Sequence, residues 1–94
     1  MMMQIVRFKS QLPREEILAV ARERAAMFRE VSGLLQKYYL DSEEPGSYAG
    51  VYIWDSVESM MRFRSSDLAA SIPAAYRVTK PPEIEIHEIV FTLR

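Results

Sequence analysis

The sequence predicts one α+β domain in which strands and helices follow one another in the order βαββαβ. Segments rich in β-branched and aromatic residues alternate with segments whose apolar residues recur every three to four positions. A Pro-Gly turn joins the two central strand segments closely enough to make them an antiparallel hairpin. The chain has 94 residues, which suits a single domain over residues 1–94.

The first half of the chain contains one strand and one long helix. Residues 3–9 form the strand, and Pro13 suits the first position of the helix, where two glutamates soon follow. Arg24 is the polar exception on the apolar stripe of this helix, and Gly33 is expected to stop it. The apolar stripe consists of Ile17, Val20, Ala21, Met27, Phe28 and Val31.

The second half supplies three strands and a second helical region. Asp55 or Ser56 is expected to cap this region. Pro73 interrupts it, so residues 66–76 are predicted to form a broken or restarted helix that Ser65-Ser66-Asp67 caps. Right-handed crossovers then place both helices on one face of a four-stranded antiparallel sheet, which is the ferredoxin-like arrangement. The strands are expected at residues 34–41, 47–54 and 83–93.

The composition excludes several classes of site. The chain has no cysteine and a single histidine, so it offers neither thiolate ligands nor a histidine cluster for a metal. It has no glycine-rich phosphate loop or dinucleotide motif, which argues against a nucleotide cofactor. Its net charge of -1 gives no attraction to nucleic acid or to a membrane. With no signal peptide or long apolar run, we expect a cytoplasmic protein.

The strand at residues 47–54 has apolar side chains on both of its faces. Its small aliphatic residues suit contact with helices, so the aromatic ones are expected on the open face of the sheet. Three such rings would expose roughly 600 Å². A homodimer that covers this face is therefore predicted. The aliphatic set is Ala49, Val51 and Ile53, and the aromatic set is Tyr48, Tyr52 and Trp54.

The sequences at residues 33–39 (Gly-Leu-Leu-Gln-Lys-Tyr-Tyr) and 49–54 (Ala-Gly-Val-Tyr-Ile-Trp) resemble those of the ydhR-like monooxygenases. This group belongs to the dimeric α/β-barrel superfamily, which includes the antibiotic-biosynthesis monooxygenases. The resemblance spans the whole element order and implies two sheets packed face to face, with a cavity between each sheet and its helices. It also implies oxygenation of a reduced aromatic substrate with O₂ and without flavin or metal. Gln36 stands where the group often has tryptophan.

Four residues of the hairpin are candidates for a substrate pocket. Tyr39, Tyr52 and Trp54 either stack a flat aromatic substrate or pack in the core or dimer interface. Lys37 either points inward to stabilise an enolate or phenolate, or protects an edge strand from aggregation. A slip of one residue in the register would turn Gln36 and Tyr38 inward instead of Lys37 and Tyr39.

The other candidates lie later in the chain. His87 is matched to general-base catalysis near neutral pH, although a lone strand histidine is also commonly solvated. Arg64 and Tyr76 lie on or just after the second helical region, where they could bind an anionic group at a cavity mouth. An ordinary solvated helix face is the alternative for both.

These residues lead to one main hypothesis and its rivals. The main hypothesis is a cofactor-independent monooxygenase that acts on a small electron-rich aromatic molecule of the quinol or anthrone type. A base would remove a proton, and the resulting anion would reduce O₂ directly. The rivals are a non-catalytic protein that binds a hydrophobic ligand, a structural dimer, and a related isomerase or lyase.

Overall fold

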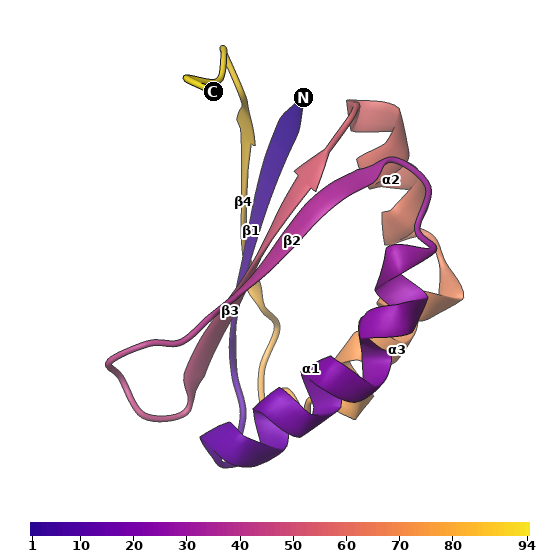
Figure 1. Ribbon diagram of the computed structural model, residues 1–94. Coiled ribbons are helices and arrows are strands. Elements are labelled where there is room, and N and C mark those ends of the chain that lie inside the picture. The colour runs from indigo at the N-terminus through magenta and orange to yellow at the C-terminus, as the bar shows by residue number, and fades with distance from the viewer.

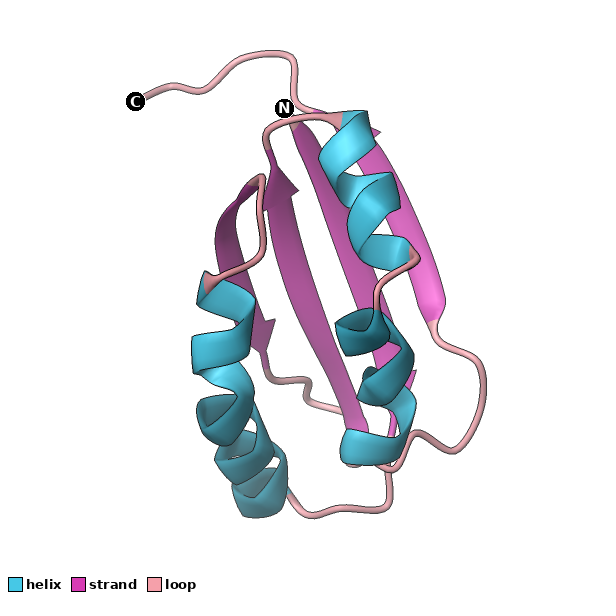
Figure 2. Cartoon of the chain, turned by 90° about the vertical axis from the view of Figure 1, so that its right-hand side faces the viewer, coloured by secondary structure: helices cyan, strands magenta, loops and turns pink.

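The computed structural model describes residues 1–94, which form a four-stranded antiparallel sheet with three helices on one face (Figures 1 and 2). The strand order across the sheet is β2-β3-β1-β4, which confirms the predicted ferredoxin-like fold. None of the helices is long and apolar enough to cross a membrane. The strands are β1 (Met2–Lys9), β2 (Leu34–Leu40), β3 (Ser47–Trp54) and β4 (Glu83–Glu88). The helices are α1 (Arg14–Arg29), α2 (Val57–Arg64) and α3 (Asp67–Ala75).

The second helical region is divided into α2 and α3, as its sequence predicted. Ser56 caps α2 by accepting a hydrogen bond from the backbone N–H of Ser59 at 3.2 Å. Ser66 caps α3 in the same way, accepting from Ala69 at 3.2 Å. Pro73 lies inside α3, so the helix restarts before the proline. The division therefore comes from the serine cap.

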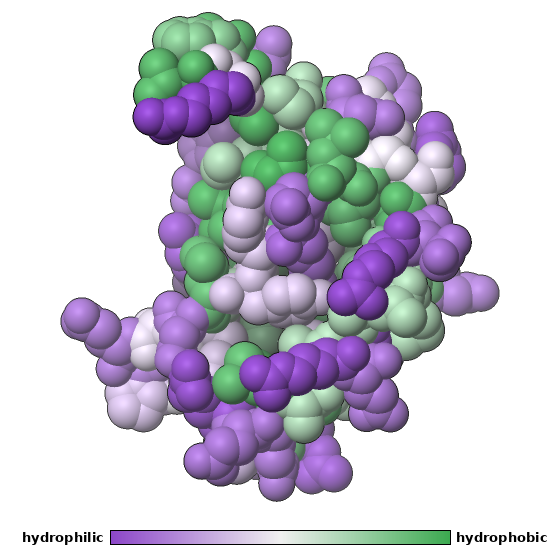
Figure 3. Space-filling view, viewed as in Figure 1, coloured by the Kyte–Doolittle hydropathy of each residue, from purple (hydrophilic) through white to green (hydrophobic).

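Strand β4 ends earlier than predicted, at Glu88 instead of residue 93. The cause is its neighbour β1, which begins at Met2 and pairs that residue with Glu88, so no partner strand continues beyond it. The last backbone hydrogen bond between these two segments runs from the Ile89 N–H to the Met1 carbonyl at 2.9 Å. The segment that follows stands out from the body of the molecule (Figures 1 and 3). Its exposed apolar residues are Val90, Phe91 and Leu93.

The orientation of β3 is opposite to the predicted one. Its aromatic residues face the helices and are buried, whereas Ala49 and Ile53 lie on the open face of the sheet with Val51. Helices α1 and α2 contribute large side chains of their own, and together these form a mixed aromatic core. The principal buried cluster consists of Phe28, Tyr52, Trp54, Met60 and Phe63. The aromatic patch expected on the open face is therefore absent, because its rings form the core.

Trp54 is the centre of this core and has no exposed surface. Its ring stacks on that of Tyr52, with centroids 5.9 Å apart and an interplanar angle of 2°, and lies 5.3 Å from that of Phe63. The indole Nε1–H donates to Oε1 of the buried Gln4 at 3.0 Å. Trp54 thus ties β3 to α2 by packing and to β1 by a hydrogen bond.

The open face of the sheet carries apolar side chains at its centre and charged ones along β4. Strand register brings Met3, Ile5, Val51 and Ile53 together on this face, with Tyr38 of β2 beside them. The charged groups are joined to each other: Glu85 accepts from Arg7 at 3.0 Å and contacts His87 at 2.5 Å. The open face is therefore an apolar strip with an ionic border.

Candidate functional site

The cavity that holds most of the predicted site residues lies between the sheet and helix α1, with the end of α3 closing one side. We call it the α1 cavity; its volume is about 120 Å³. Its walls are mainly apolar and aromatic, as expected for a small-molecule site. The lining residues are Val6, Phe8, Arg14, Ile17, Leu18, Lys37, Tyr39, Leu40, Asp41, Tyr48, Ala49, Gly50, Tyr52, Ile72 and Tyr76.

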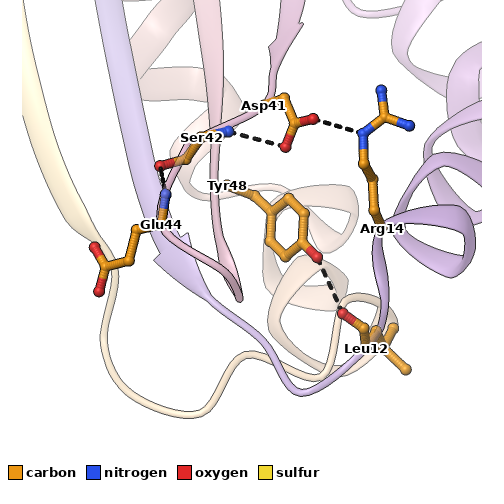
Figure 4. Close-up of polar contacts among 6 residues, drawn as sticks. All are labelled: Leu12, Arg14, Asp41, Ser42, Glu44 and Tyr48. Carbon is orange, nitrogen blue, oxygen red and sulfur yellow. Dashed lines mark hydrogen bonds and ion pairs between the residues drawn. The ribbon is translucent and has the colours of Figure 1, made fainter.

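Polar contacts hold the chain at one end of this cavity (Figure 4). Arg14 at the start of α1 donates from Nε to Asp41, just after β2, at 2.5 Å. This bond, followed by the bond from the Ser42 backbone N–H, lowers the pKa of Asp41. Tyr48 donates its hydroxyl to the Leu12 carbonyl at 3.1 Å. The end of β2 is therefore joined to α1 through side chains that themselves line the cavity.

Lys37 extends from β2 into the space between the sheet and α1. Pairing with Tyr52 of β3 turns its side chain to the helix face of the sheet. Its Nζ lies 3.5 Å from the ring centroid of Phe28, 4.5 Å from that of Tyr39 and 4.7 Å from that of Tyr52. Such ring faces attract a cation, but they replace water poorly. Burial, followed by the nearby positive charge of Arg24, lowers the pKa of Lys37 to about 7.

Arg24 is the second cation of this interior. It reaches from α1 to α3, where its Nη2 donates to Ser71 Oγ at 2.6 Å, while its Nε is buried without a hydrogen-bond partner. Neither Arg24 nor Lys37 forms an ion pair with a carboxylate. The sequence had marked Arg24 as the polar exception on an apolar stripe, but its closeness to Lys37 follows only from the packing of α1 on the sheet.

Three tyrosines complete the polar lining of the cavity. Burial raises the pKa of Tyr39, Tyr52 and Tyr76, the last to about 12. Arg24 acts against this rise in all three, and Arg29 does so at Tyr39. All three therefore keep their hydroxyl protons at neutral pH and can donate hydrogen bonds to an oxyanion.

A second and larger space lies between β1, β4 and the two shorter helices. We call it the α2–α3 cavity; its volume is about 440 Å³. It shares Val6, Tyr52 and Ile72 with the α1 cavity, so Tyr52 borders both. Arg64 lines it, and Gln4 is its other polar side chain besides Tyr52. Most of the remaining wall is aliphatic, so this cavity offers less chemistry than the α1 cavity.

The structure brings some of the predicted site residues together and separates others. Trp54 lines neither cavity, because it is fully buried beneath Tyr52 and the helices. Arg64 lies in the α2–α3 cavity. His87 lies on the open face of the sheet, where its side chain is 54% exposed and contacts Glu85, so it is remote from the α1 cavity. The predicted site residues that do line the α1 cavity are Lys37, Tyr39, Tyr52 and Tyr76.

Sequence reasoning did not identify Arg14, Asp41 or Arg24 as parts of the site. The first two are separated by a helix and a strand in the sequence, and no local pattern links them. His, Asp and Glu side chains do not gather anywhere in a group of three that could hold a metal ion. The site therefore offers the amine of Lys37, four phenols and the paired Arg14 and Asp41, with the guanidinium of Arg24 nearby.

Comparison with known proteins identifies the fold. The sequence matches no protein-family model and no curated protein. The structure is similar to SnoaB, a cofactor-independent oxygenase from Streptomyces nogalater, with a TM-score of 0.78 and 19% identity over 98% of this chain and 95% of that one. It is also similar to a monooxygenase from the gene ActVA-Orf6 of Streptomyces coelicolor in complex with nanaomycin D, with a TM-score of 0.77 and 18% identity over 99% and 90% of the two chains.

A candidate antibiotic biosynthesis monooxygenase from Deinococcus radiodurans matches with a TM-score of 0.76 and 16% identity, over 100% of this chain and 97% of that one. At such identities the likeness concerns the fold, because one fold serves many functions. The narrower ydhR-like relationship stays a prediction. The chain thus has the ferredoxin-like fold seen in these oxygenase structures, over nearly its whole length.

Proposed function

We propose that this protein is a cofactor-independent monooxygenase that acts on a small quinol in the α1 cavity. One observation carries the proposal: the amine of Lys37 lies on the wall of an aromatic cavity, among three rings and without an ion pair to a carboxylate, with its pKa lowered to about 7. A base of this strength is matched to proton transfer at neutral pH. The reactions named for SnoaB and for the ActVA-Orf6 monooxygenase support the same reaction type.

The proposed mechanism uses Lys37 twice. Its neutral amine takes the phenolic proton, and the ammonium so formed stabilises the phenolate beside it. Tyrosine hydroxyls from the cavity wall donate hydrogen bonds to the same oxygen. The electron-rich ring then reduces O₂: one oxygen atom forms a C–O bond with the ring, and the other leaves as water. The overall balance is quinol plus O₂ to hydroxyquinone plus water.

The size of the α1 cavity favours a single ring. Its volume of about 120 Å³ is close to the roughly 150 Å³ of a cavity that admits benzene. A three-ring anthrone would need space that this cavity does not have. A one-ring quinol is therefore the preferred substrate class, and the larger α2–α3 cavity is proposed to be outside the reaction.

Oxygen uptake with hydroquinone and methylhydroquinone tests the proposal. We expect log(kcat/KM) to rise with a slope of about one below pH 7 and to level off above it, because the neutral amine is the active form and Lys37 gains its proton as the pH falls. The rates are measured against protein-free reactions at each pH, since quinols oxidise spontaneously in base. The hydroxyquinone is identified by mass spectrometry.

Lys37→Arg is the matched variant for this measurement, because it keeps a cation in place but cannot release a proton near neutral pH. The variant should lose the rise through pH 7 along with most of the activity. Uptake no faster than in protein-free reactions, or a profile that Lys37→Arg leaves unchanged, would contradict the proposal. Binding of quinol without oxygen uptake would favour the non-catalytic alternative.

We also propose that two copies pair through the open face of the sheet. The support is the apolar strip formed by Met3, Ile5, Val51, Ile53 and Tyr38, which lies opposite the helices. Tyr38 is 52% exposed in the single chain. A chain of this size buries only about 60–65% of its unfolded surface, so a partner on this face would add needed burial. The exposed apolar residues of the C-terminal segment are available to the same interface.

Ile5→Glu tests the pairing, because it places a charge at the centre of the strip. Light scattering on a sizing column should give the wild type a mass twice that of one chain and give this variant the mass of one chain. Val57→Glu is the control, since Val57 is an exposed aliphatic residue that lies on α2, away from the strip. A wild type that runs as a monomer across a dilution series would refute the pairing.

The proposed location is the cytoplasm. Its support is the lack of cysteine, which is consistent with a compartment where disulfides do not form. Fractionation of cells that produce the protein would test this location.

A further inference from the structure

Lys37 has the surroundings of a nucleophilic amine as well as those of a base. Its Nζ lies against the rings of Phe28, Tyr39 and Tyr52, and its side chain lines the α1 cavity. Lys37 also lines a groove between α1 and β2. A small molecule in either space would therefore meet this residue.

We propose that Lys37 forms an imine with small aromatic aldehydes that enter the α1 cavity. This covalent site would exist whether or not the chain oxidises quinols. The cavity suits one aromatic ring, and the lysine among the ring faces supplies the nucleophile.

The charges around Lys37 favour its neutral form. Arg24 of α1 is the cation that acts on it. Lys37 forms no ion pair, so no carboxylate stabilises its protonated form. The other titratable groups that face it are the phenols of Tyr39 on β2 and Tyr52 on β3, which are uncharged at neutral pH. Desolvation and a neighbouring cation are the two features that activate lysine nucleophiles in general.

The proposed reaction needs no oxidant or reductant. The nitrogen lone pair of Lys37 attacks the aldehyde carbon, and the carbonyl oxygen takes a proton to give a carbinolamine. Loss of water then completes the C=N bond, with both hydrogens of the water coming from the amine. Tyrosine hydroxyls of the cavity wall can hold the departing oxygen, and the apolar walls favour the dehydrated product.

The chain is well suited to a test because Lys9 and Lys80 are its only other lysines. Lys9 pairs with Glu44 at 3.0 Å, and both lysines are exposed. With a pKa of about 7, Lys37 is neutral in about half of the molecules at pH 7. An ordinary lysine is neutral in fewer than about one molecule in a thousand. The amine of Met1 is the one other competitor for the aldehyde at this pH.

The experiment treats the whole protein with benzaldehyde and cyanoborohydride at about pH 7, without oxygen and without a quinol. Cyanoborohydride reduces the imine to a stable benzylamine, and peptide mapping by mass spectrometry locates it. We expect labelling of Lys37 to exceed that of Lys9 and Lys80 by at least about tenfold, as the larger neutral fraction requires. The labelling rate should rise with pH through a midpoint near 7.

Two variants and one larger aldehyde separate the site from general amine reactivity. Lys37→Arg should abolish the Lys37 adduct and leave labelling of Lys9 unchanged, whereas Lys9→Arg should leave the Lys37 adduct intact. Anthracene-9-carbaldehyde, whose three rings exceed the α1 cavity, should not label Lys37. If it does, the aldehyde reacts from the groove between α1 and β2, and the proposed place in the α1 cavity is wrong. Equal labelling of all three lysines, labelling confined to Met1, or a Lys37 midpoint near 10 would overturn the proposal. None of these outcomes depends on oxygen uptake, so the result is independent of the proposed function.

Discussion

Replacing Lys37 with methionine should lower kcat/KM for quinol oxidation by about 10²–10⁴-fold, the usual contribution of a general base. Methionine keeps the length and apolar stem of the side chain, so the cavity should keep its shape. The loss would come from the missing amine, which both takes the phenolic proton and stabilises the phenolate. Oxygen electrode rates at about pH 8, where the wild-type amine is mostly neutral, measure the effect directly.

The same variant should remain folded, and its stability should have a distinctive pH dependence. Native Lys37 has a pKa below the ordinary 10.5, so between about pH 7 and 10.5 the unfolded chain binds a proton that the native chain does not. The free energy of unfolding of the wild type therefore increases as the pH rises through that window. Below about pH 7 the native protein carries the full cost of a buried, protonated Lys37. Lys37→Met should lack this gain.

Urea denaturation followed by circular dichroism at about pH 6 and pH 9 tests this expectation. The stability of Lys37→Met relative to wild type should be highest at the lower pH and should decline at the higher one. Lys9→Met is the control, because Lys9 is exposed and pairs only at the surface. A Lys37→Met protein that loses activity only because it unfolds would contradict the proposed role.

Trp54→Ala should have the largest effect on stability. The change removes a fully buried ring from the aromatic core, which costs about 3–5 kcal/mol. It also leaves the buried Gln4 Oε1 without its donor, which costs about 1–3 kcal/mol more. Total stabilities of small domains are about 5–15 kcal/mol, so the variant should be largely unfolded or close to it at room temperature.

Thermal denaturation by circular dichroism checks this prediction, since each 1 kcal/mol shifts the midpoint of such a domain by about 4–8 °C. Trp54→Phe is the matched control: it keeps an aromatic ring but loses the hydrogen bond to Gln4, so a smaller shift of about 4–24 °C is expected. If Trp54→Ala melted close to the wild type, the core placement of Trp54 would be wrong.

Most of the fold could be predicted because its signals are local. The amphipathic pattern of α1, the Pro-Gly turn of the hairpin and the serine at each of the later helix starts lie within a few residues of the structure that they specify. The end of β4 could not be predicted this way, because it depends on where β1 begins. Strand length was set by the partner, not by the apolar residues beyond Glu88.

The orientation of β3 could not be predicted because both of its faces are apolar. Alternation then gives two equivalent assignments, and the choice depends on partners that are distant in sequence. Gln4 on β1 and Phe63 on α2 provide the contacts that Trp54 needs. The aromatic side chains fill the space under the helices, whereas the aliphatic ones cover the flatter open face.

The site was predicted in part, for similar reasons. Lys37 and Tyr39 face the helices because a register irregularity between Leu34 and Gln36 resets the alternation of β2. No sequence pattern could reveal that irregularity, so the choice between the two registers had stayed open. The position of His87 on the open face follows from its pairing with Met3 across the sheet. Residue type identified Lys37 and His87 as candidate bases. Only the strand pairing shows that they lie on opposite faces of the sheet.

The stacked pair of Trp54 and Tyr52 gives the molecule a built-in optical reporter. Trp54 is the sole tryptophan, and its emission depends on the electronic state of the ring that lies parallel to it. Tyr52 also lines both cavities. A charged or aromatic ligand bound next to Tyr52 would therefore alter the intensity or wavelength of indole emission without any added dye. Occupancy of the interior can be titrated on the unmodified chain.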